Sequence, residues 1–183
     1  MIVRVALRSN PLECGERLSR RTPHDLQALY LDDVFRYVSA FVRPEDEAED
    51  VTMEVFHAAF KHLSKLRRAD DPRLWLLGIA RRKVADSLRK HYRRREEPLT
   101  SEVLAKPGAD IDAELVLDQV LKTLPNDQRE ALALKYINGL SIEEVAVVLT
   151  RSPEAANSLI QRARQSFFEK GAPHFLIQGE ESK

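Results

Sequence analysis

Residues 140–164 read LSIEEVAVVLTRSPEAANSLIQRAR, a stretch in which two short amphipathic segments are separated by a turn. Ser141 and Glu144 have the spacing of a capping box, which predicts that the first helix begins at this serine. Ser152 followed by Pro153 predicts the start of the second helix, because serine caps a helix and proline suits its first position. Two short helices joined in this way are typical of a helix-turn-helix unit.

The second of these helices has an apolar side and a polar side. Its inward positions would be Ala156, Leu159, Ile160, Ala163 and Phe167. Its outward positions would be Glu154, Asn157, Ser158, Gln161 and Arg162. Asparagine, glutamine and arginine read base edges when such a helix lies in a major groove, so the stretch predicts DNA binding. A plain helical hairpin with the same caps stays open as the alternative, and the outward side is only weakly basic.

A second informative stretch, residues 74–95, is rich in arginine. Wound as a helix, it carries on one side Leu77, Ala80, Val84, Leu88 and His91. The opposite side carries Trp75, Arg82, Arg89 and Arg93, with Asp86 among them. Guanidinium groups bind phosphates, and an exposed aromatic ring can stack on an unpaired base, so this side predicts a nucleic-acid contact. The alternatives are that Trp75 packs on a neighbouring helix and that the arginines form a solvated surface.

Charge is separated along the chain although its formal net charge is zero. Residues 45–54 contain six Asp or Glu and no Lys or Arg. Residues 61–95 contain thirteen Lys or Arg and three Asp. The position of charge decides which partner a surface attracts, so we expect one acidic and one basic interaction surface.

The apolar pattern predicts an all-α fold of two small helical domains joined by a flexible linker, because no segment alternates with a period of two. The expected parts are an N-terminal extension (1–22), a first domain (23–95), a linker (96–112), a second domain (113–170) and a C-terminal tail (171–183).

Three helices are expected in the first domain. The first would begin with Thr22 as its cap and run to about Val42, with Leu29 among its inward residues. The second would run from about Glu45 to Leu63, and a charged connector (64–72) would lead to a third helix from about Pro72 to Arg94.

In the second domain, a first helix is indicated by Leu115, Val116, Leu121 and Leu124. The next would run from Pro125 to Ile137.

Several classes of protein are excluded by composition. The single cysteine, Cys14, allows no intrachain disulfide, and the five scattered histidines predict neither a metal site nor a bound cofactor. No apolar run approaches the roughly 20 residues of a membrane span, and residues 1–10 lack the pattern of a signal peptide. The sequence therefore predicts a cytoplasmic protein without membrane insertion.

Three segments resemble the extracytoplasmic-function family of bacterial RNA polymerase sigma factors. AEDVTMEVFHAAFKHL (48–63) and DPRLWLLGIARRKVADSLRK (71–90) resemble consecutive helices of the family's region 2. LPNDQREALALKYINGLSIEEVAVVLTRSPEAANSLIQRAR (124–164) resembles both halves of region 4. The likeness extends over about residues 25–170.

The resemblance implies a function and a set of site residues. Such a factor binds core RNA polymerase, and the holoenzyme recognises a promoter at its −35 and −10 elements. Polymerase binding is implied for Glu49, Asp50, Glu54 and Phe56. Contacts at the −10 element are implied for Lys65, Arg67 and Arg68, in a loop over 65–71 that captures a flipped base, and for Trp75, Arg82, Lys83 and Arg89. Contacts at the −35 element are implied for Asn157, Ser158, Gln161 and Arg162. Many members are held inactive by an anti-sigma protein, which is the further partner implied.

The chain departs from the family pattern at four positions. Met53 replaces a common glutamine, and Thr150 replaces a common turn glycine. Asn157 and Leu159 stand where Lys and Arg are frequent, so we expect fewer phosphate contacts at the −35 element.

Two other functions are considered. A stand-alone helix-turn-helix regulator would explain residues 140–164 but would leave the acidic segment without a role. An enzyme would need a convergent carboxylate cluster, a metal site or a nucleophile–base pair, whereas the acids here lie within one helical segment, which suits docking better. We therefore expect no catalytic activity.

Overall fold

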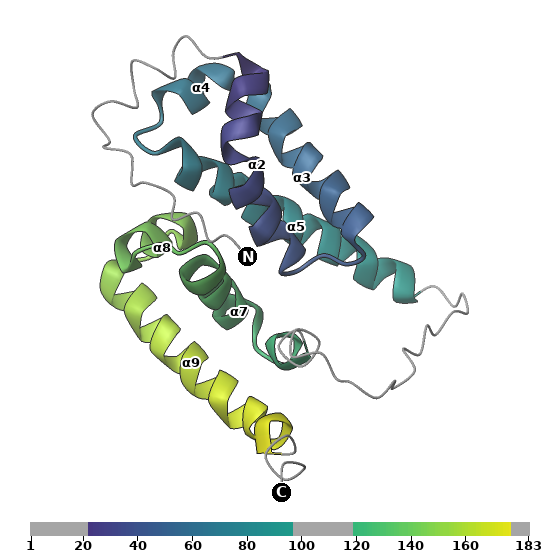
Figure 1. Cartoon of the computed structure of the whole chain (residues 1–183), viewed down its shortest axis with the longest axis vertical. Helices are drawn as coiled ribbons and strands as arrows, with labels where there is room; N and C mark the ends of the chain where they lie inside the picture. Colours follow the sequence, from purple (N-terminus) through teal and green to yellow (C-terminus); the bar gives the residue numbers. More distant parts are fainter. Residues whose placement is uncertain (1–21, 97–118, 177–183) are drawn as a thin grey trace, which may run out of the picture. The chain divides into compact units, whose positions relative to one another are not determined.

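The computed structural model describes residues 22–96 and 119–176, and every regular element in them is helical (Figure 1). This confirms the predicted all-α fold. The chain divides into two compact units, Met1–Asp86 and Ser87–Lys183, with the boundary inside the long helix α5. Residues 1–21, 97–118 and 177–183 lie outside the described residues; they include nearly all of the expected linker, and also Leu115 and Val116 of the expected helix that follows it.

Helices α2 (Pro23–Ser39) and α3 (Glu45–Phe60) pack against each other in the first unit. Helix α2 begins as predicted: the Asp25 amide donates to Thr22 Oγ1 at 3.2 Å, and the Thr22 amide donates to Asp25 Oδ2 at 2.9 Å. Its buried residues are Leu26, Tyr30, Val34, Tyr37 and Val38. Leu29, which was expected to face inward, is instead 47% exposed.

The connector expected over 64–72 is partly helical, so that prediction is wrong for its first half. Helix α3 ends at Phe60, and a separate short helix α4 (Leu63–Arg68) follows. Leu66 of α4 is 1% exposed, and burial of this side chain stabilises a helix whose other residues are mostly charged.

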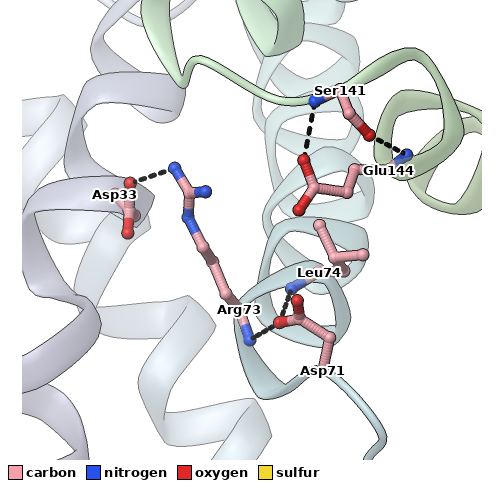
Figure 2. A network of polar contacts seen from close by, with 6 residues as sticks. All are labelled: Asp33, Asp71, Arg73, Leu74, Ser141 and Glu144. Carbon is pink, nitrogen blue, oxygen red and sulfur yellow. Dashed lines mark hydrogen bonds and ion pairs between the residues drawn. The ribbon is translucent and has the colours of Figure 1, made fainter. Parts of the chain in front are cut away.

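Helix α5 (Pro72–Glu96) begins where the sequence predicted. The Asp71 carboxylate accepts from the amides of Arg73 at 2.8 Å and Leu74 at 3.1 Å, so it satisfies two free donors of the first turn (Figure 2). The Arg73 side chain reaches α2 and pairs with Asp33 at 2.7 Å. These contacts hold the start of α5 against α2.

The second unit contains the end of a helix at Gln119–Lys122, then α7 (Asn126–Leu132), η1 (Ala133–Ile137), α8 (Ile142–Leu149) and α9 (Pro153–Leu176). Part of its core is formed by Leu124, Leu132 and Ala163, with Leu121 and Phe167 packed against them. These inward positions confirm the apolar pattern read from the sequence.

The helix expected over 125–137 changes type before it ends. Its last five residues, Ala133–Ile137, form a π-helix, and the Asn138 amide donates to the Ala133 carbonyl at 3.0 Å. Lys135 Nζ then donates to the Leu140 carbonyl at 3.0 Å across the turn at Gly139, whose φ is +69°. The wider turn allows Leu140 to be buried, with no exposed surface.

Candidate polymerase and nucleic-acid interfaces

Helix α8 is capped as the sequence predicted. The Ser141 amide donates to Glu144 Oε2 at 2.6 Å, and the Glu144 amide donates to Ser141 Oγ at 3.1 Å (Figure 2). Both bonds satisfy amides that a helix start leaves free, so the direction of α8 is set by its own first turn.

The turn between α8 and α9 depends on a left-handed residue. Thr150 has φ +56° and ψ +50°, a conformation that is costly for a β-branched side chain and free of that cost for glycine. The turn is closed by the Arg151 amide, which donates to the Ala146 carbonyl at 2.9 Å. Threonine at position 150, where the family commonly has glycine, therefore strains the backbone of this turn.

We expect Thr150→Gly to raise the free energy of unfolding of the second unit by roughly 0.5–1 kcal/mol. The left-handed conformation costs a non-glycine residue about 1–2 kcal/mol, and the greater freedom of glycine in the unfolded chain offsets part of this gain. Thr150→Ala is the matched control, because it keeps the Cβ atom that causes the strain. Hydrogen exchange of α8 and α9 amides measures both changes, and equal stability of the two variants would show that the turn is not strained.

Helix α9 has the two sides that the sequence predicted. Ala156, Leu159, Ile160 and Ala163 are buried, and the exposed side consists of Glu154, Asn157, Ser158, Gln161 and Arg162. Ser152 Oγ accepts from the Ala155 amide at 3.2 Å and caps the helix. Leu159, one of the two positions at which the family often has Lys or Arg, is only 1% exposed and belongs to the buried side of the helix.

Two details set the electrostatics of this exposed side. Arg162 Nε donates to the Ser158 carbonyl at 3.3 Å, so this guanidinium lies along its own helix. A backbone hydrogen bond of Glu154, aided by the Ser152 side chain, holds the pKa of the Glu154 carboxyl below its ordinary value. Glu154 therefore adds one carboxylate to the start of α9, next to the polar residues that would read bases.

Helix α3 exposes carboxylates along its outer side. Glu49, Asp50 and Glu54 are all exposed, and Met53 between them is 51% exposed. Phe56 does not belong to this surface. It is 1% exposed, and its ring lies 5.9 Å from that of Phe60, centroid to centroid. The side chain that the resemblance places at the polymerase thus lies in the hydrophobic core.

The basic residues lie on two helices. Lys65, Arg67 and Arg68 are on α4, so the loop implied for them is helical up to Arg68; Lys65 and Arg68 are exposed, and Arg67 is half-buried. On α5, Arg82 and Arg89 are exposed, as expected.

The inward side of α5 is buried as far as Val84. His91, which was assigned to that side, is exposed, so the apolar side ends earlier than predicted. Trp75 is half-buried, which leaves part of its ring for contact with a partner.

The structure brings together two site residues that the sequence assigned to different partners. Lys83 Nζ of α5 donates to Glu54 Oε2 of α3 at 2.9 Å. The two residues are 29 positions apart, so no helical periodicity could have linked them. Another contact that the sequence did not indicate is the one from Gln27 Nε2 to Met53 Sδ, at 3.4 Å.

None of the helices in 22–96 and 119–176 combines the length and apolar character that a bilayer crossing requires. Across the same ranges, no group of three or more His, Cys, Asp or Glu side chains is placed to hold a metal ion.

An acidic helix beside a basic one, together with a capped helix-turn-helix, defines a helical DNA-binding protein with a second, acidic interaction surface. Family models agree: "Sigma-70 region 2" matches residues 26–94, and "Sigma-70, region 4" matches residues 114–167. These matches, together with 33% identity to an extracytoplasmic-function sigma factor, show that the chain belongs to the extracytoplasmic-function family of RNA polymerase sigma factors. It is thus a sigma factor that directs promoter-specific transcription initiation, and the stand-alone regulator is not favoured because that reading leaves the region 2 match unexplained.

Individual relatives support the same assignment. The chain is 33% identical to the ECF RNA polymerase sigma factor SigC of Mycobacterium tuberculosis, over 79% of this chain and 80% of that protein. It is 26% identical to the ECF sigma factor SigM of Bacillus subtilis, over 79% of this chain and 91% of that one.

Two solved structures share the fold. The sigma factor RpoE of Bartonella quintana, solved with the anti-sigma factor NepR, has a TM-score of 0.65 and 22% identity, over 80% of this chain and 94% of that one. CnrH, solved with the cytosolic domain of CnrY, has a TM-score of 0.60 and 22% identity, over 93% of this chain and 97% of that one.

Proposed function

We propose that this sigma factor docks on core RNA polymerase through the outer side of α3, contacts the −10 element with α4 and α5, and reads the −35 element with α9. The observation that carries the proposal is the separation of charge within the first unit: α3 exposes carboxylates, whereas α4 and α5 expose lysines and arginines. The protein works in the cytoplasm, where the polymerase and its promoters are, and has no catalytic activity of its own.

The docking surface consists of Glu49, Asp50 and Glu54. Carboxylates suit this role because the polymerase surface that receives sigma factors of this family is basic. Complementary charge speeds the encounter and sets the register of the complex. Phe56 supports this surface from within the core instead of touching the polymerase, since it is 1% exposed.

The −10 surface consists of Lys65, Arg67 and Arg68 on α4, and of Trp75, Arg82, Lys83 and Arg89 on α5. Its lysines and arginines bind phosphates, and the exposed part of Trp75 offers a platform for an unpaired base. The domain limits proposed are 23–95 for this function and 113–170 for −35 recognition, with residues 96–112 as the linker.

The −35 surface consists of Asn157, Ser158, Gln161 and Arg162. Asparagine and glutamine can bond both N6 and N7 of adenine, and arginine can bond O6 and N7 of guanine. The exposed, capped geometry of α9 supports this role. An anti-sigma protein is a further partner proposed, because both solved relatives described above are complexes with another protein, which for RpoE is named as an anti-sigma factor.

Replacing Arg82 and Arg89 together with alanine is expected to reduce open-complex formation about tenfold or more while leaving core affinity nearly unchanged. Each lost phosphate contact should also lower the slope of log affinity against log salt by roughly 0.7–0.9. Permanganate reactivity of a promoter measures opening, and fluorescence anisotropy measures core binding. The exposed pair Arg36 and Arg43, replaced in the same way, is the charge-matched control. Equal losses of opening and of core binding would instead place α5 at the polymerase or in a structural role.

A further inference from the structure

The ion pair between Glu54 and Lys83 joins the proposed docking surface to the proposed −10 surface. Their side chains lie 2.9 Å apart and remain 50% and 31% exposed, so both are within reach of a partner. We propose that this pair couples polymerase docking to DNA binding: Lys83 competes with the polymerase for the Glu54 carboxylate, and docking releases Lys83 to DNA. The inference rests on the proposed function and deepens it.

The coupling arises because each of the two charges is partly neutralised by the other. A carboxylate that pairs with Lys83 attracts a basic polymerase surface less strongly, and an ammonium group that pairs with Glu54 attracts phosphate less strongly. When the polymerase supplies a competing positive charge and the DNA supplies a phosphate, the pair can open without leaving either group unpaired. By thermodynamic linkage, DNA that binds Lys83 must in turn strengthen docking by the same factor.

The exposure of the Glu54 and Lys83 side chains limits the size of the coupling between docking and DNA binding. Exposed pairs contribute little because water and salt screen them, so the expected coupling is about two- to fivefold in affinity. A pair this weak can be exchanged without unfolding. It is also suited to a coupling that must be reversed when the factor leaves the polymerase.

Lys83→Gln should tighten core binding about two- to fivefold, although the lysine is assigned to DNA. Lys90→Gln is the control, because it removes the same charge from an exposed position two turns further along α5. The gain should shrink as salt is raised and should vanish in a Glu54→Gln background. If Lys83→Gln and Lys90→Gln change core affinity equally, or if the gain survives without Glu54, the coupling is overturned.

A second measurement needs neither DNA nor polymerase. Acetic anhydride should label Lys83 of the free chain faster in Glu54→Gln than in wild type, and Asp32→Asn, at an exposed site on α2, should leave that rate unchanged. Equal labelling in wild type and Glu54→Gln would overturn the proposal. The proposed function fails separately: if Glu54→Gln does not weaken core binding at all, the docking assignment is wrong, whatever Lys83→Gln does.

Discussion

Asp50→Lys is expected to weaken binding to core RNA polymerase by roughly 10- to 100-fold, or about 1.4–3 kcal/mol, without unfolding the protein. Asp50 is exposed on the outer side of α3, between Glu49 and Met53, which is itself 51% exposed. Reversal of its charge removes an attraction to a basic partner and adds a repulsion. No core packing is lost, so the helical circular dichroism spectrum should not change.

The measurement is co-elution of purified protein with core polymerase from the source organism, followed by anisotropy titration. Asp32→Lys is the matched control, because it makes the same change of charge at an exposed position of α2. The effect of Asp50→Lys should also be largest at low salt, since exposed charges are screened. Unchanged affinity, or an equal loss in Asp32→Lys, would remove α3 from the docking surface.

Phe56→Ala is expected to lower the free energy of unfolding of the first unit by about 3–5 kcal/mol, the usual cost of truncating a buried phenylalanine. Its ring is 1% exposed and lies against Phe60, so the truncation leaves a cavity. Domains are stable by only about 5–15 kcal/mol, and the variant would therefore be close to unfolding at growth temperature.

Urea unfolding followed by tryptophan fluorescence reports on this unit selectively, because Trp75 is the chain's single tryptophan. Met53→Ala is the control on the same helix: its side chain is 51% exposed, and its removal should change stability by no more than about 0.5 kcal/mol. Core binding by Phe56→Ala should be measured at a temperature at which the variant is still folded. Near-normal stability with lost core binding would show that Phe56 contacts the polymerase after all.

Local rules predicted the starts of α2, α5, α8 and α9, and the two sides of α9. A cap such as Ser141 with Glu144, or Ser152 before Pro153, acts within one turn of the chain, so its residues suffice to place the start of a helix. The inward positions of α9 from Ala156 to Ala163 follow from helical periodicity, which is equally local. The function was predicted from a different source, the resemblance of three consecutive segments to regions 2 and 4 of the sigma factors.

The sequence was insufficient where a residue's role depends on what packs against it. Phe56 and Met53 are both apolar and lie three positions apart on α3, yet one is 1% and the other 51% exposed. The charges around position 66 predict a connector, but Leu63–Arg68 is a helix in which Leu66 is 1% exposed. The π-helical geometry of η1 is likewise not indicated by any local pattern in the sequence.

By itself, therefore, the sequence determined an all-α fold with an acidic and a basic helix and a capped helix-turn-helix, because capping and periodicity act over a few residues. The function of a sigma factor came from the resemblance of three segments to that family. Only the tertiary structure decided which side chains of those helices remain accessible. It also decided that Glu54 and Lys83, 29 positions apart, form one ion pair. Burial and pairing depend on how α3 and α5 pack, and this packing brings together residues that no local pattern connects.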